Sequence, residues 1–290
     1  MDTKTCLVAL CLVPGVGGVT LRALLDRFKS VEAVLEAPED ELQSVPGVGP
    51  RIAAGIRAIN VEHTEAEIET WCMDQIGILA WDEPAYPIRL RDLHDAPPIL
   101  FCRGTLNGND ARAVSIVGTR SPSLASRTLA EQLAAELARR GWTIVSGLAW
   151  GVDFAAHEGA LRNGRTIAVL GSGLRAALPS ARHALAARIL DQGQGALLSE
   201  THPDADPSPA ALVARNRLIA GLSRAVIVIE AGMESGSLYA AKQALKQGRT
   251  LFAVQNGSAG NAALIADKSA YPLEANFADW DRLDDLLTRL

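Results

Sequence analysis

Three glycine-bearing turns, each placed directly after an apolar run, constrain most strongly what this chain of 290 residues can fold into. The apolar runs are 113–117, 142–145 and 225–229, and the turns that follow them are 118–121, 146–151 and 230–237. Further apolar runs occupy 166–170, 196–198 and 250–254. Continuous apolar runs are typical of strands covered on both faces. Their alternation with helix-forming segments predicts an α/β fold with a doubly wound, mostly parallel sheet.

The chemistry of these turns indicates a site for phosphate. Parallel strands end at one edge of a sheet, so we expect the three turns to lie together there. Glycine lets a ligand approach the backbone closely, and a helix that begins at such a turn directs free N–H groups toward it. The first turn adds the guanidinium of Arg120, and the third adds the hydroxyls of Ser235 and Ser237. The short Gly171-Ser172-Gly173 stretch does not by itself predict a dinucleotide.

A second domain is indicated by the helix-forming first 60 residues. The segments 13–21 and 45–53 share the phrase Val-Pro-Gly-Val-Gly, which resembles the helix-hairpin-helix motif. In that motif a glycine turn presents backbone N–H groups to a phosphate, although a hairpin used only for packing has the same sequence pattern. We therefore expect a helical domain of the helix-hairpin-helix or SAM-like type over 1–75, a Rossmann-like domain over 76–275, and a C-terminal helix over 276–290.

Charge and composition narrow the classes of function. The net charge of −5 argues against a polycation that coats duplex DNA, but it allows a local basic pocket. Arg215 and Arg217 flank Asn216 at the expected start of a helix, where we do not expect core residues. Guanidinium groups suit contacts to phosphate or stacking on bases. Ion pairs of these arginines with Glu200 or Glu230 are the alternative.

Cysteine spacing and hydropathy predict a protein without a structural metal or a membrane segment. The four cysteines show no C-x-x-C spacing, which favours buried, reduced thiols in a cytoplasmic protein. The apolar start, Met1 to Val13, is too short for a membrane span and is typical of a core helix. No cofactor is predicted.

Asp153 and His157 are four residues apart on one expected helix face, a spacing that would suit acid–base catalysis. Structural roles are the alternative, and the family resemblance given next favours them. Asp153 should accept hydrogen bonds from the turn, and His157 should be a hydrogen-bonded residue beneath the pocket.

The ordered motifs together resemble the DNA-processing protein A (DprA/Smf) family. They comprise Gly118-Thr119-Arg120, the 146–157 segment, Ser199-Glu200, the 215–223 segment and Ser235-Gly236-Ser237, and the resemblance covers roughly residues 80 to 270. It implies an extended Rossmann-like domain that binds single-stranded DNA, forms a homodimer, and helps to load a RecA-type recombinase during natural transformation, without enzymatic activity. The DNA-binding residues it implies are Gly118, Thr119, Arg120, Ser146, Gly147, Arg215, Asn216, Arg217, Ser235, Gly236 and Ser237. We add Lys242, which should lie about two turns into the last helix of the sheet domain, near the pocket.

Two stretches depart from the family pattern. The family usually has Tyr-Pro shortly after the Gly-Ser-Gly stretch, where this chain has Arg175-Ala176-Ala177-Leu178-Pro179, and Val-Pro-Gly where it has Val254-Gln255-Asn256-Gly257. We expect both stretches at the edge of the pocket. The chain resembles a short form of the family that lacks a winged-helix-like C-terminal domain.

Two other functions remain open at this point. One is a nucleotide-processing enzyme of the phosphoribohydrolase (lysine-decarboxylase-like) type on the same fold, although its Pro-Gly-Gly-x-Gly-Thr stretch is absent. The other is an interaction scaffold whose pocket no longer binds a ligand.

Overall fold

The computed structural model describes residues 2–191, 193, 195–276 and 279–290, and it divides into two compact units. The smaller unit comprises the residues up to Tyr86 together with Arg91–Phe101. The larger comprises Pro87–Leu90 and Cys102–Leu290. The domain boundary predicted at residue 75 stays a prediction; it lies within the smaller unit.

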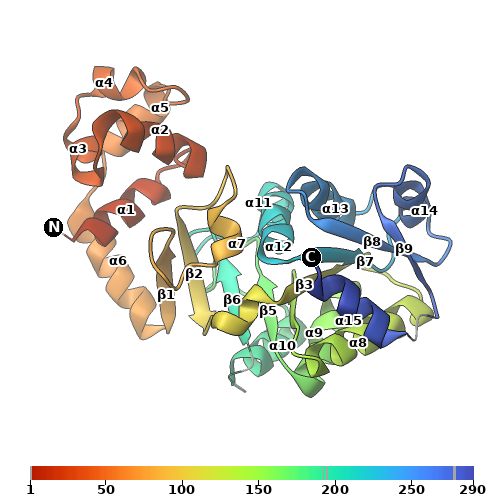
Figure 1. Cartoon of the computed structure of the whole chain (residues 1–290). Coiled ribbons are helices and arrows are strands. Elements are labelled where there is room, and N and C mark those ends of the chain that lie inside the picture. The colour runs from red at the N-terminus through yellow and green to blue at the C-terminus, as the bar shows by residue number, and fades with distance from the viewer. Residues whose placement is uncertain (1, 192, 194, 277–278) are drawn as a thin grey trace. The chain divides into compact units, whose positions relative to one another are not determined.

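The smaller unit is a tandem of helical hairpins, as the two Pro-Gly-Val-Gly phrases predict (Figure 1). Its elements are α1 (Thr3–Leu12), α2 (Gly18–Phe28), α3 (Val31–Glu36), α4 (Glu39–Gln43), α5 (Pro50–Arg57), α6 (Val61–Met73) and β1 (Ile76–Ala80). Gly15 and Gly47 have φ angles of 96° and 87°, which favour glycine and reverse the chain between paired helices. α1 is a core helix, with Thr5 through Leu10 buried.

The two hairpins differ in their surroundings. A Cβ at Gly18, where α2 begins, would lie 2.0 Å from the carbonyl oxygen of Ala96, so this helix start is packed against another segment of the same unit. A Cβ at Gly47 or Gly49 would meet no atom within 4 Å. The start of α2 is therefore closely packed, whereas the turn at Gly47 and Gly49 has open space around its glycines.

The larger unit contains the predicted parallel sheet, with strand order β6-β5-β4-β3-β7-β8-β9 and parallel pairing throughout. The strands are β3 (Ala113–Val117), β4 (Thr143–Ser146), β5 (Thr166–Val169), β6 (Gly195–Ser199), β7 (Ala225–Val228), β8 (Thr250–Gln255) and β9 (Tyr271–Glu274). β2 (Ile99–Gly104) precedes them in the chain. The sequence did not predict β9, because only Leu273 of this edge strand is buried and no apolar run marks it.

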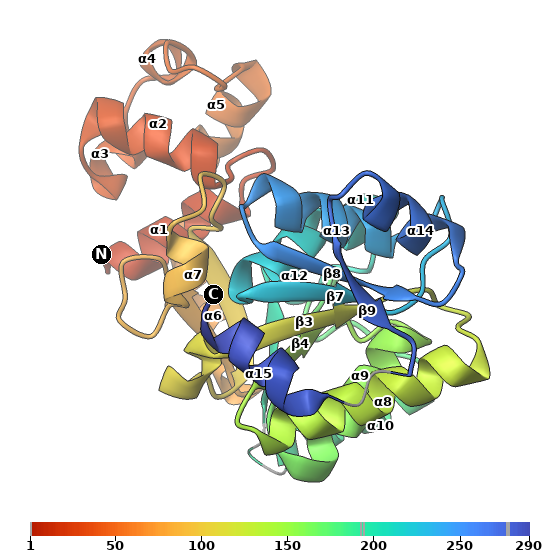
Figure 2. The same cartoon turned by 45° about the vertical axis from the view of Figure 1, so that its right-hand side comes forward.

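Helices cover both faces of this sheet (Figure 2). On one face lie α8 (Leu124–Arg139), α9 (Val152–Asn163), α10 (Ser180–Asp191) and α15 (Trp280–Thr288); on the other lie α11 (Pro209–Ala214), α12 (Asn216–Leu222) and α13 (Ser237–Lys246). The short α7 (Ile88–Arg91), a 3₁₀ turn (Gly108–Ala111) and α14 (Ala259–Ala266) complete the elements. This is the doubly wound arrangement that the sequence predicted.

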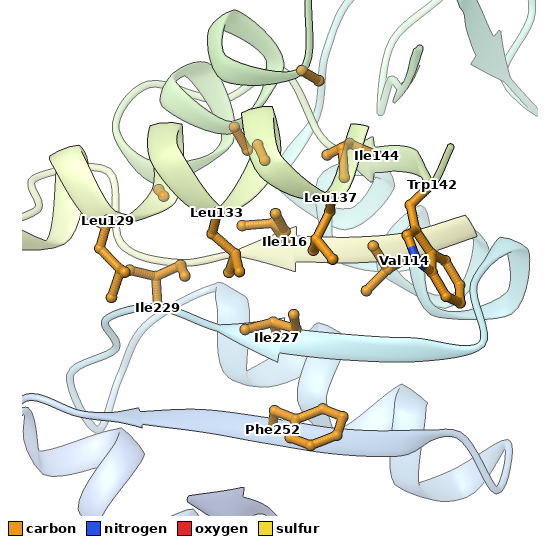
Figure 3. Packing of buried hydrophobic residues seen from close by; sticks show 14 of the residues in the cluster. Val114, Ile116, Leu129, Leu133, Leu137, Trp142, Ile144, Ile227, Ile229 and Phe252 are labelled. Carbon is orange, nitrogen blue, oxygen red and sulfur yellow. The ribbon is translucent and has the colours of Figure 1, made fainter. Parts of the chain in front are cut away.

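The core beneath α8 holds β3 and β7 in place (Figure 3). Leu129, Leu133 and Leu137 point from the helix onto the sheet, where Ile116 and Ile227 are fully buried. Burying a leucine side chain contributes about 1.5–3 kcal/mol. The packing fixes the ends of these strands, and therefore the turns that follow them.

Within the described ranges, no helix combines the length and the apolar character that crossing a membrane requires.

Candidate functional site

A pocket of about 640 Å³ lies at the carboxyl ends of the neighbouring strands β4, β3 and β7. Its wall is formed by the three glycine turns and the segment around the start of α12. The lining residues are Val117, Gly118, Thr119, Arg120, Ala149, Asp153, Pro209, Leu212, Val213, Arg215, Asn216, Gly232, Glu234, Ser235, Gly236 and Ser237. The predicted convergence of the three turns is thus confirmed.

The first turn brings an exposed cation to the pocket. The N–H of Thr119 donates to the carbonyl of Glu230 at 2.7 Å, which joins the turn after β3 to the turn after β7. Arg120 is exposed and lines the pocket. Within the described part of the chain, its guanidinium has no carboxylate partner. Arg120 is therefore able to meet an anion without first breaking an ion pair.

The second cation, Arg215, is buried, with only 6% of its surface exposed. Its Nη1 donates to the carbonyl of Val169 at 2.6 Å, and its Nη2 lies 3.9 Å from Oδ2 of Asp153. Its Nε is buried without a hydrogen-bond partner. The expectation that Arg215 lies outside the core was wrong: the turn after β4 covers the guanidinium, because Gly147 leaves room for it.

Asp153 and Gly147 fix the shape of the second turn. The N–H of Gly147 donates to Oδ2 of Asp153 at 3.2 Å, as expected for a carboxylate that accepts from the turn. Burial raises the pKa of Asp153, and the adjacent Arg215 opposes that shift. Burial also lowers the pKa of Arg215, a shift to which the charges of Arg120 and Arg182 add.

His157 has the structural environment that the sequence predicted. Its Nε2 accepts the N–H of Leu148 at 3.3 Å, so Nδ1 carries the proton and donates to Oγ1 of Thr166 at 2.7 Å. The Thr166 hydroxyl in turn donates to the carbonyl of Ile144. Burial lowers the pKa of His157 to about 3, with a smaller effect from Arg215. This neutral imidazole holds Leu148 at a φ of 53°, which is costly for a residue other than glycine.

The third turn provides hydrogen-bond donors and one acid. α13 begins at Ser237, and Oγ of Ser235 and Oγ of Ser237 are 2.7 Å apart. A helix N-terminus presents free N–H groups and a partial positive charge, which together attract anions. Glu234 is exposed and lines the same wall, so it opposes the binding of an anion there.

A third arginine, Arg182, acts on this site and was not predicted from the sequence. It is partly buried on α10, and burial together with the charge of Arg120 lowers its pKa. Its Nε is buried without a hydrogen-bond partner. The sequence feature that could have indicated it is a basic residue at the start of the helix after β5. This residue lies three positions after 175–179, one of the two stretches that differ from the family pattern. Three guanidiniums thus act on one another at this site, a repulsion that a bound anion would relieve.

Four residues in the predicted set do not line the pocket: Ser146, Gly147, Arg217 and Lys242. The Ser146 hydroxyl is buried and donates to the carbonyl of Ile116 at 2.7 Å. Arg217 forms an ion pair with Glu200, one of the two acids named as its alternative partners. Lys242 is exposed on α13, with Nζ 5.8 Å from the ring centroid of Tyr239. The two stretches that depart from the family pattern, 175–179 and 254–257, are also outside the lining.

No cluster of residues suited to a metal ion occurs in the described ranges. Cys6 and Cys102 are buried, Cys11 is partly buried and Cys72 is exposed, so the expectation that all the thiols are buried was wrong for Cys72. Burial raises the pKa values of Cys11 and Cys102 to about 12, which keeps these thiols protonated and unreactive.

Comparison with known proteins relates both units to described families. A family model for DNA recombination-mediator protein A matches residues 77–281, and one for a SAM-like helix-hairpin-helix tandem matches residues 8–58. Protein Smf from Synechocystis sp. is 38% identical over 250 residues, which cover 84% of this chain and 62% of that protein. The chain therefore spans less than two thirds of the length of this relative.

Two solved structures share the fold. The X-ray structure of DNA processing protein A from Streptococcus pneumoniae matches with a TM-score of 0.79 and 30% identity, over 94% of this chain and 95% of that one. A structure that describes the single-stranded DNA binding mode of DNA processing protein A from Helicobacter pylori matches with a TM-score of 0.65 and 33% identity, over 74% and 97%.

Proposed function

Because the chain belongs to the DNA recombination-mediator protein A family, we propose that it is a recombination mediator that binds single-stranded DNA in the pocket lined by Arg120 and Arg215. The observation that carries this proposal is that Arg120 and Arg215 line one pocket at the carboxyl ends of β4, β3 and β7, with Arg182 near enough for its charge to act on both. A chain with a net charge of −5 has no general attraction for DNA, so a local cluster must supply it.

The roles of the lining residues follow from their exposure. Arg120 is exposed and meets the phosphate first, while Arg182 and the buried Arg215 add positive charge behind it. The N–H groups at the start of α13 and the hydroxyl of Ser235 donate to phosphate oxygens. Gly118, Thr119, Asn216, Gly236 and Ser237 shape the wall. Ser146, Gly147 and Arg217 support this arrangement from outside the lining.

The physiological setting belongs to the same proposal. The protein protects incoming single strands in the cytoplasm and helps to load a RecA-type recombinase on them during natural transformation. It acts as a homodimer and by binding, without catalysis. The H. pylori relative, for which a single-stranded DNA binding mode is described, supports the nature of the ligand.

The enzymatic alternative has little support in the geometry. A general base needs a ring nitrogen free to reach a substrate, but both nitrogens of His157 are engaged within the fold. Asp153 is engaged by the turn and by Arg215. A nucleotide-processing enzyme on this fold would have to recruit other residues.

The test is a fluorescence anisotropy titration with a labelled single-stranded oligonucleotide, followed by competition with a blunt duplex of equal length. We expect the single strand to bind more tightly, with a salt slope that corresponds to about 0.7 per phosphate neutralised. Arg120→Ala should weaken binding about 10- to 150-fold, as expected for the loss of a charge-assisted contact. Arg139→Ala removes an exposed arginine of α8 and serves as the matched control.

Equal or tighter binding of the blunt duplex would contradict a confined single-strand site. An unchanged affinity of the Arg120→Ala variant would exclude this pocket. Hydrolysis of added nucleotides by the wild-type protein, lost on changing His157, would support the enzymatic alternative.

A further inference from the structure

An aromatic pair with one exposed ring, that of Trp150, adjoins the pocket lining. Trp150 is 45% exposed, and its ring is stacked on that of Phe154 with centroids 5.3 Å apart and planes inclined by 20°. It immediately follows Ala149, which lines the pocket. In contrast, Trp142 of the same unit is 1% exposed and belongs to the core. A tryptophan this exposed has an apolar ring face that does not contribute to the packing of the core.

The backbone fixes this pair beside Arg120. A Cβ at Gly151 would lie 2.3 Å from the carbonyl oxygen of Thr119 and 2.7 Å from the carbonyl carbon of Arg120. The N–H of Val152 donates to the same Thr119 oxygen at 3.2 Å. The turn that carries Trp150 is therefore in direct contact with the turn that carries Arg120, and their relative position does not depend on long side chains.

Phe154 gives the indole a preferred orientation. It lies four residues after Trp150, within the first turn of α9, and is only partly buried. An indole that already rests on a second ring has little rotational freedom to lose when it binds a third flat group. Near-parallel stacking of this kind leaves the opposite face of the indole available.

We propose that the Trp150–Phe154 pair is a stacking platform for a nucleobase of the strand whose phosphate is held beside Arg120. This inference rests on the proposed function and adds the element that recognises bases. A cation beside an aromatic ring suits a nucleotide, because the cation binds the phosphate and the ring stacks on the base. Inside a duplex the bases are stacked on one another, and only the two terminal base pairs expose a face, so the platform favours single strands.

The experiment compares three labelled probes of equal length: an oligothymidylate, its abasic deoxyribose-phosphate counterpart, and a blunt duplex. Trp150→Ala should lower the affinity for oligothymidylate about 5- to 150-fold, the range found for loss of one base–aromatic stack. It should leave the affinity for the abasic strand unchanged. Trp150→Phe should restore most of the binding. Tyr271→Ala removes an exposed aromatic of β9 that does not line the pocket and is the matched control.

A second measurement, the quenching of tryptophan emission on binding, uses the wild-type protein and so does not depend on whether the Trp150→Ala variant folds. Binding of oligothymidylate should quench tryptophan emission in the wild-type protein, and the quenching should be lost in Trp150→Phe. Unchanged affinity of Trp150→Ala, an equal loss on the abasic strand, or quenching that persists in Trp150→Phe would overturn the platform. If the wild-type protein bound neither single strand, the proposed function itself would fail. If the wild-type protein bound oligothymidylate and the Trp150→Ala variant bound it equally well, only this inference would be refuted.

Discussion

The guanidinium of Arg215 occupies the space directly against the backbone of Gly147. A Cβ at position 147 would lie 1.7 Å from Nη1 of Arg215, a distance that no pair of heavy atoms tolerates without a bond. The glycine after β4 thus leaves room for a buried arginine from the start of α12. The first glycine turn is similar, because a Cβ at Gly118 would lie 2.5 Å from the side chain of Val152. Both glycines serve the packing between elements, whatever ligand the pocket holds.

Replacing Gly147 tests this relationship. Gly147→Ala should displace the Arg215 guanidinium and lower the free energy of unfolding by about 1–3 kcal/mol, as for other overpacked sites. Because Arg215 lines the pocket, the affinity for single-stranded DNA should fall as well. Thermal unfolding and anisotropy on the same samples measure the two effects. Gly108→Ala is the control, since a Cβ there would meet no atom within 4 Å. Equal behaviour of the two variants would refute the packing argument.

Arg182 should contribute to DNA binding although the pocket lining does not include it. Arg182→Ala removes a charge that acts on both Arg120 and Arg215, so binding should weaken about 10-fold or more. The salt slope should also fall by about 0.7 if Arg182 neutralises one phosphate. The Arg120→Ala, Arg182→Ala double change should be less than additive if both side chains share that phosphate. A variant with wild-type affinity and slope would remove Arg182 from the site.

Arg217 should act mainly on stability. Its ion pair with Glu200 has side chains that are only 16% and 23% exposed, so losing one partner leaves a poorly solvated charge. Arg217→Ala should lower the free energy of unfolding by about 1–3 kcal/mol. Adding Glu200→Ala should recover part of that loss in a double-mutant cycle. A large loss of DNA affinity in Arg217→Ala at unchanged stability would instead place this arginine at the DNA.

His157 should make stability depend on pH in a definite direction. Its pKa in the folded state, about 3, is below its ordinary value of 6.5, so the unfolded chain takes up the proton first as the pH falls. The stabilisation is complete above pH 6.5 and is lost as the pH decreases from about 6.5 toward 3, by up to about 1.4 kcal/mol per pH unit.

Denaturant titrations of the wild type and of His157→Gln between pH 7.5 and 4.5 measure this dependence. The variant should be less stable at pH 7.5, because glutamine does not reproduce the rigid ring that contacts both Leu148 and Thr166, but its stability should decrease less on acidification. The raised pKa of Asp153 is present in both proteins, so the difference isolates the histidine. His63→Gln, at a side chain that is 73% exposed, should match the wild type. Parallel pH profiles for wild type and His157→Gln would contradict a buried neutral imidazole.

The sequence by itself determined the strands, the turns and their common edge. Apolar runs such as 113–117 and 225–229 need burial on both faces. This requirement follows from consecutive residues alone, so the sequence is enough to predict these strands. The strand pairing then brings Gly118, Ala149 and Gly232 to one pocket, because parallel strands all end at the same edge. The edge strand β9 was missed for the same reason, since it needs little burial.

Only the tertiary structure decided which charged side chains face the pocket. Arg215 and Arg217 are two residues apart, yet one is buried under Gly147 and the other is paired with Glu200. Arg182 acts on the site from α10, on the face of the sheet opposite to α12, whose start carries Arg215. Trp150 is exposed on the turn that contacts the Arg120 turn. Long side chains reach several ångströms in directions set by their neighbours, so their partners depend on packing between distant segments that no local pattern records.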